Sequence, residues 1–194
     1  MNNNIMLQFK FDKEKCTSIL SYITQNVKTA DFLRVFKVLY FAEQKHLVRF
    51  GRPIVGDNYI AMKHGPVPSN IYNELRQIKG GTGKFMDILL KNSISFSDYF
   101  EVSKVQDVDN ILAKNNPELD IISESELMCI NESLNENKDL SFNELSNKSH
   151  DSAWEKANLN DEMDILDIAQ SGGASPDMLN YISIMAENQD FTFA

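Results

Sequence analysis

The sequence predicts a mainly α-helical (α+β) fold: a single helical domain with a central buried helix and a small β hairpin or sheet. Several segments repeat apolar residues at helical spacing. Residues 29–51 are apolar on most sides, as is typical of a helix in the centre of a domain. Residues 53–72 combine short extended runs with Gly and Pro, which favours a small hairpin. A length of 194 residues suits one domain.

The first two helices carry recognisable start and stop signals. Asp12 is a suitable N-cap for a helix over 13–26, and Thr29 or Asp31 for the helix that follows. Gly51 and the following proline end this second helix. Four basic side chains form a narrow stripe on it that we expect to be solvated: Arg34, Lys37, Lys45 and Arg49.

The stretch "MKHGPVPSNIY", residues 62–72, predicts a rigid corner between a strand and a helix. Two short extended runs around the turn signal "GDN" precede it. Pro66 and Pro68 lack backbone N–H groups, so we expect "GPVP" to lie outside any sheet. Gly65 permits a backbone conformation that a Cβ atom would forbid, and Val67 is expected to turn inward.

The rest of the chain predicts further helices and one strand. "YFEVSKV", residues 99–105, alternates as a strand does. The predicted helices start near Ser69, at Ser123 or Ser125, at Ser141 and at Ser175, and the one from Ser141 runs to about residue 158. Between the last two lies an acidic and then Gly-rich connector. We expect residues 1–157 to form the main domain, with the connector and C-terminal helix of 158–194 packed on it.

Composition and motifs argue against most enzymatic and nucleic-acid functions. A formal net charge of −9 opposes non-specific binding to phosphate backbones. Cys16 and Cys129 form no CxxC pair and fit buried thiols. The three histidines lack zinc-ligand spacing, so no metal site is expected. Residues 149–151 read Ser-His-Asp, but consecutive helical side chains point about 100° apart and relay no proton. We expect no enzyme and no cofactor.

The start of the chain lacks the apolar region of a signal peptide, and no apolar run is long enough to span a membrane. The sequence therefore predicts a cytoplasmic protein.

Two blocks resemble the Panacea antitoxin domain, a SocA-like family formerly described as phage-associated. The first is "KVLYFAEQKHLVRFGRPIVGDNYIAMKHGPVPSNIY", residues 37–72. The second is "ISESELMCINESLNENKDLSFNELSNKSHDSAWEKA", residues 122–157. The resemblance implies a helical, non-enzymatic antitoxin that binds and neutralises a protein toxin encoded beside it. The alternative that it implies is a proteolytic adaptor, which delivers the toxin to a ClpXP-type AAA+ protease. We do not expect direct DNA binding.

The resemblance also assigns roles to residues. The motif expected to define the fold comprises Leu39, Tyr40, Phe41, Gly65, Pro66, Val67 and Pro68. The candidates for contacting the toxin are Lys63, His64, Tyr72, His150 and Trp154. Acidic residues concentrate in the later half of the chain, so the partner is expected to be a basic toxin.

Overall fold

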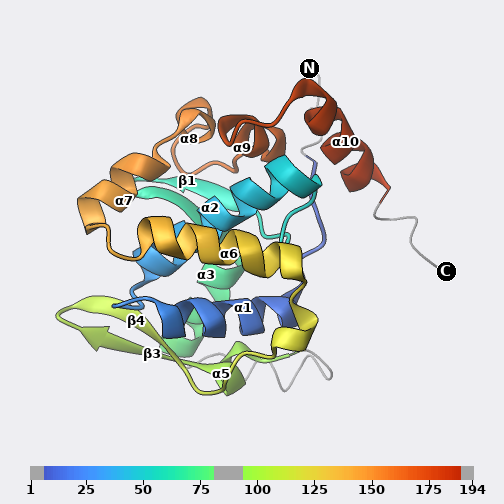
Figure 1. Cartoon of the computed structure of the whole chain (residues 1–194). Coiled ribbons are helices and arrows are strands. Elements are labelled where there is room, and N and C mark those ends of the chain that lie inside the picture. Colours follow the sequence, from blue (N-terminus) through green and yellow to red (C-terminus); the bar gives the residue numbers. More distant parts are fainter. Residues whose placement is uncertain (1–6, 81–93, 189–194) are drawn as a thin grey trace.

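The computed structural model describes residues 7–80 and 94–188 and confirms the α+β class, with helices predominating over two small antiparallel sheets (Figure 1). The elements are α1 Lys13–Asn26, α2 Phe32–Phe50, β1 Tyr59–Met62, β2 Gly65–Pro68, α3 Ser69–Gly80, α5 Phe96–Tyr99, β3 Phe100–Val105, β4 Val108–Ala113, the 3-10 helix η1 Leu119–Ile121, α6 Glu124–Asn137, α7 Phe142–Ser149, α8 Ser152–Lys156, α9 Ile165–Ser171 and α10 Pro176–Glu187.

Helix α2 is the central buried element, as predicted. It packs against α1, α6, α7, α9 and β2, and Figure 1 shows it running behind α6 through the middle of the molecule. Its apolar residues feed two clusters. Val35 and Leu39 belong to the cluster that α1, α3, β3 and α6 complete. Tyr40 and Leu47 belong to the cluster that β1, α8, α9 and α10 complete. One helix therefore ties both halves of the core together.

The helix starts follow the predicted caps. Asp12 accepts from the backbone N–H of Lys15, and Asp31 accepts from that of Arg34. Ser123 and Ser141 each form a full capping box with a glutamate three residues on. Gly51 closes α2 at φ +67°, where a left-handed residue is required. The glycine pair Gly80–Gly81 predicts the end of α3, and the structure describes this helix as far as Gly80, so Gly81 lies outside the described residues.

The first sheet differs from the prediction in the place of its turn and in the role of "GPVP". The turn lies at Lys63–His64 rather than at "GDN", and Gly65–Pro68 is strand β2, paired with β1. The backbone of Ala61 in β1 forms its hydrogen bonds on the side away from β2. Its N–H donates to the Asp161 carbonyl, and its carbonyl accepts from the Asn160 N–H. Its partner Pro66 therefore occupies a pair without interstrand hydrogen bonds, where a missing N–H costs nothing.

Three further elements depart from expectation. Strand β4, which pairs with β3 in a second hairpin, was not predicted. Helix α9, which was not predicted, lies inside the acidic and Gly-rich connector. The helix predicted from Ser141 stops at Ser149, and α8 begins again after Asp151.

Three residues of the basic stripe of α2 form contacts with neighbouring segments. Lys45 forms an ion pair with Glu136 at 2.7 Å, and Arg49 with Glu132 at 2.7 Å, both on α6. Arg34 donates to the carbonyl of Lys138 at 2.6 Å. Arg49 is exposed to solvent, as predicted, whereas Lys45 and Arg34 are partly buried. Their contacts were not predicted because sequence periodicity does not show that α6 lies along this face of α2.

Candidate functional site

Two of the five candidate residues form the β1–β2 turn. Lys63 and His64 are both exposed there. The His64 ring lies edge-on to Phe142, with 5.2 Å between ring centroids. Phe142 is the first residue of α7, so the turn and the start of α7 adjoin each other.

His150 and Trp154, at the junction of α7 and α8, support this turn. The Trp154 Nε1–H donates to the carbonyl of Met62 at 2.9 Å, which ties α8 to the end of β1. His150 stacks on Trp154 with 3.8 Å between centroids and 21° between planes. Burial lowers the pKa of His150, more than its backbone hydrogen bond with Lys63 raises it, so the ring is neutral at pH 7. Both rings are half-buried and hold the turn in place.

Tyr72 approaches the same region from α3. Its ring stands edge-on to Phe32 and Phe36 of α2, at centroid distances of 6.4 and 6.3 Å. The guanidinium of Arg76 lies 5.6 Å from the Tyr72 ring centroid. Tyr72 is half-buried, with part of its surface left accessible.

A groove of about 480 Å³ lies beside the turn and connects these residues. Its lining comprises Asp31, Phe32, Leu33, Phe36, Lys37, Met62, Lys63, His64, Val67, Tyr72, Val108, Asp109, Phe142 and Asn160. The structure thus brings Lys63, His64 and Tyr72 to one groove, while His150 and Trp154 stay behind the turn. An apolar groove with a few polar groups is the usual form of a recognition site.

The floor of the groove contains a buried lysine. Only 1% of the Lys37 surface is exposed, and its Nζ donates to the carbonyl of Pro66 at 2.6 Å. Burial lowers the pKa of Lys37 to about 7, although Asp151 nearby favours the charged form. The prediction of a solvated Lys37 was therefore wrong, because the hairpin folds over it.

The residues of the motif expected to define the fold are mostly buried. Leu39, Tyr40 and Phe41 of α2 are buried, as are Gly65, Pro66 and Pro68, whereas Val67 is half-buried. Gly65 has φ +93°, and a Cβ atom there would lie 2.1 Å from the Ser149 hydroxyl and 2.9 Å from Lys37 Nζ. The hairpin can approach α2 and α7 this closely only with glycine at this position.

The Ser149-His150-Asp151 run forms no proton relay. The Ser149 hydroxyl donates to the carbonyl of Ser146 at 2.9 Å. The Asp151 carboxylate accepts from the Tyr40 hydroxyl at 2.8 Å and caps α8. Each group is thus directed to a separate structural partner.

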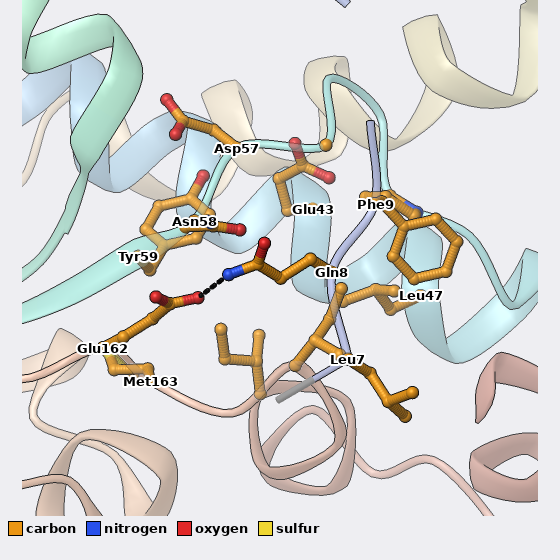
Figure 2. Close-up of a pocket in the computed structure, with 14 residues that line it drawn as sticks. Leu7, Gln8, Phe9, Glu43, Leu47, Asp57, Asn58, Tyr59, Glu162 and Met163 are labelled. Carbon is orange, nitrogen blue, oxygen red and sulfur yellow. Dashed lines mark hydrogen bonds between the residues drawn. The ribbon is translucent and has the colours of Figure 1, made fainter. Parts of the chain in front are cut away.

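A second, much smaller cavity of about 20 Å³ lies at the start of strand β1 (Figure 2). Glu43, Asp57 and Tyr59 line it, together with residues 7–9 and with Glu162, Met163, Ile165 and Ile168. Figure 2 shows the Gln8 side chain crossing it to Glu162. Burial raises the pKa of Glu43 to about 7. The volume suits about one water molecule, so the cavity is too small for an organic ligand.

In the part of the chain that the structure describes, no three His, Cys, Asp or Glu residues gather to hold a metal ion. Cys16 and Cys129 are free buried thiols, as predicted. Among the helices of 7–80 and 94–188, none is long and apolar enough to cross a membrane.

Several groove residues were missed by sequence reasoning. Phe142, Leu33 and Val108 come from three separate elements, and only the fold brings them together. The sequence contained one signal for Phe142. It is a large apolar residue directly after the N-cap Ser141, and the first position of that helix is exposed.

Comparison with known proteins places this chain in a family. Neither a curated protein nor a solved structure matches it. The family model of the SocA-like antitoxin, Panacea domain, matches residues 35–155, from the first turn of α2 into α8, and includes the groove lining except Asp31, Phe32, Leu33 and Asn160. The chain therefore belongs to the SocA-like antitoxin family that carries the Panacea domain.

Proposed function

We propose that this protein is an antitoxin that neutralises a cognate protein toxin by binding it directly, through the face around the β1–β2 turn. Family membership over residues 35–155 supports the antitoxin role. The observation that carries the choice of face is the groove, on which Lys63, His64 and Tyr72 converge from the turn and from α3.

The roles of the five candidates divide by exposure. Lys63 and His64 are exposed and Tyr72 is partly accessible, so these three contact the toxin. His150 and Trp154 position the turn through the Trp154–Met62 hydrogen bond and the ring stack. A turn held in this way loses little conformational entropy when a partner binds.

Charge supports a basic toxin. Asp161, Glu162, Asp164 and Asp167 line an open hollow of about 430 Å³ between α8 and α9. Lys156 is the basic residue in this lining, and it pairs with Asp167 at 2.6 Å. Asn160, one residue earlier, lines the groove, so the acidic hollow adjoins it. Opposite charge on the toxin would speed association and orient it.

Co-expression with the product of the adjacent open reading frame tests the proposal. We expect the wild type to rescue growth and to co-purify with that product. The double variant Lys63→Ala/His64→Ala is expected to weaken both growth rescue and co-purification, because it removes two side chains that contact the toxin. Both side chains are exposed, so the core stays undisturbed. Rescue in which the partner protein disappears without a complex would instead support the adaptor that feeds an AAA+ protease.

A further inference from the structure

The two strands of the first hairpin are held to the rest of the molecule in different ways. On the outer edge of β1, the Ala61 N–H donates to the Asp161 carbonyl at 3.0 Å, and the Ala61 carbonyl accepts from the Asn160 N–H at 2.7 Å. The Tyr59 carbonyl accepts from the Met163 N–H at 2.8 Å. The backbone of the segment after α8 therefore fixes β1 along its length.

Strand β2 is attached through a side chain instead. Pro66 and Pro68 carry no N–H, and the Pro66 carbonyl belongs to a pair without interstrand hydrogen bonds. This carbonyl accepts from Lys37 Nζ at 2.6 Å, which joins β2 to the central helix α2. A buried lysine thus takes the place of the backbone partner that β1 has.

Lys37 is enclosed beneath the hairpin. Only 1% of its surface is exposed. A Cβ atom at Gly65 would lie 2.9 Å from Lys37 Nζ and 3.0 Å from its Cε. The ammonium group can therefore reach water only if residues 63–67 move away from α2.

Movement of residues 63–67 would alter the face to which we assign toxin binding. Three groove residues lie in this stretch: Lys63, His64 and Val67. On the β1 side of the turn, Trp154 holds the Met62 carbonyl at 2.9 Å. On the β2 side, Lys37 holds the Pro66 carbonyl, so the turn has one arm fixed by β1 and one arm that Lys37 can release.

Release changes the protonation of Lys37. Its pKa is about 7 in the folded chain, because burial opposes the charge more strongly than Asp151 favours it, and 10.5 in water. His150 is neutral at pH 7, since burial and the neighbouring Lys37 lower its pKa. The other titratable groups around Lys37 are Tyr40, which donates to Asp151, and the groove residues Asp31, Lys63, His64 and Asp109. Between pH 7 and 10.5, Lys37 therefore takes up a proton when it leaves its site.

We propose that Lys37 is a positioning residue for toxin binding: it latches β2 to α2 through the Pro66 carbonyl, and residues 63–67 leave α2 with uptake of a proton by Lys37. The positioning role rests on the proposed function, whereas the latch itself does not. A turn that is latched before the toxin arrives loses less entropy on binding. Release becomes harder as the pH rises above 7, because the proton that it requires becomes scarcer.

Amide hydrogen exchange of the free protein tests the latch. The alternation of the antiparallel pair places the N–H groups of Gly65 and Val67 in hydrogen bonds to β1. These bonds break when β2 leaves the fixed β1. Where closing is faster than exchange, the intrinsic rate rises about tenfold per pH unit, while the opening constant falls about tenfold. We therefore expect exchange rates at Gly65 and Val67 that stay constant, within about twofold, from about pH 7.5 to 9.

Lys37→Met is the principal variant, since it keeps an unbranched buried side chain that neither donates nor titrates. Its matched control is Lys45→Met on the same helix, because Lys45 pairs with Glu136 and does not line the groove. In Lys37→Met, the exchange rates of Gly65 and Val67 should rise about tenfold per pH unit. In Lys45→Met, they should stay constant, as in the wild type.

The positioning role is tested on the complex with the product of the adjacent open reading frame. Lys37→Met should bind this product about tenfold more weakly, because its turn must be ordered on binding. Lys45→Met should bind within about twofold of the wild type. In the wild-type complex, exchange at Gly65 and Val67 should be slower than in the free protein, because the toxin binds the latched turn. Thermal unfolding checks that both variants are folded.

A tenfold rise per pH unit at Gly65 and Val67 in the wild type would overturn the latch, and this measurement requires no variant. Unchanged affinity in a folded Lys37→Met, or a complex that leaves exchange at both amides unchanged, would overturn the positioning role. A wild type that does not bind the product would overturn the proposed function together with the positioning role, while the exchange profile would still decide whether the latch exists.

Discussion

At the scale of single residues, Gly65 fixes how closely the first hairpin approaches α2. Any other residue at this position would meet two separate costs. One is the backbone strain of a φ of +93°, and the other is the short distance from its Cβ to Ser149 and Lys37. Gly173 provides a natural control, because it has φ +98° but open space around it.

Gly65→Ala is expected to lower the free energy of unfolding by about 2–4 kcal/mol, through backbone strain plus overpacking. Gly173→Ala should cost only the strain, about 1 kcal/mol. Urea denaturation of both variants measures the difference. Equal losses in the two would show that the hairpin does not press on Ser149 and Lys37.

Lys37 makes stability depend on pH. Its pKa is about 7 when folded and has its ordinary value of 10.5 when unfolded, so the unfolded chain binds more protons between these values. The free energy of unfolding therefore rises with pH above about 7, by up to about 1.4 kcal/mol per pH unit. Glu43 has the opposite effect below pH 7, because its pKa is raised to about 7 in the folded chain: the free energy of unfolding falls as the pH rises toward 7.

Lys37→Met should remove the rise between pH 7 and 9 while leaving the acid side of the profile unchanged. Urea unfolding of wild type and variant at pH 7, 8 and 9 measures the two slopes. Parallel slopes would mean that Lys37 is not buried in its neutral form.

At the scale of elements, Asp57 connects the first sheet to α3. Its carboxylate accepts from the backbone N–H groups of Asn70 and Ile71, at 2.9 and 3.0 Å, in the first turn of α3. A side chain twelve or more residues before the helix thus caps it. Because Tyr72 lies in the same turn, Asp57 also sets one wall of the groove.

Asp57→Ala should lower the free energy of unfolding by about 2 kcal/mol, at the upper end for a lost cap, since two helical donors lose their acceptor. Asp12→Ala, which removes a more exposed cap accepting from one N–H of α1, should cost about 1 kcal/mol. Urea denaturation of the two variants tests whether Asp57→Ala loses more stability than Asp12→Ala. A smaller loss in Asp57→Ala than in Asp12→Ala would contradict this account.

Sequence patterns predicted the long elements and missed what depends on pairing. Capping residues and periodicity located α1, α2, α6 and the start of α10 correctly. The rule against proline in a sheet failed at Pro66, because it does not apply to positions whose N–H would face away from the neighbouring strand. The stop at Ser149 was missed because Asp151 caps a new helix within an apparently continuous helical pattern.

At the scale of the whole molecule, α2 belongs to both core clusters. Of the C-terminal piece expected over 158–194, the structure describes residues 158–188. Ile168 and Ile182 of that piece lie in the same cluster as Tyr40. Shared packing of this kind favours one cooperative unfolding unit.

Trp154, the single tryptophan, reports on the second cluster, whereas far-UV circular dichroism reports on all helices. We expect the two signals to give the same urea midpoint. A tryptophan transition at distinctly lower urea would show that the C-terminal elements unfold separately from the rest.

The candidate site was predicted in part. Resemblance to the family supplied Lys63, His64 and Tyr72, which the fold assembles on one groove. The pattern contained no sign that Leu33, Val108 and Phe142 would join them, because residues so far apart in sequence meet only through tertiary packing.

The most direct test of the account is the titration of purified wild-type protein with the purified product of the adjacent open reading frame, followed by size-exclusion chromatography. The account predicts a stable complex in which the partner's toxic activity is blocked, and a weaker complex for Lys63→Ala/His64→Ala. An unaltered partner that elutes apart from this protein would contradict direct neutralisation.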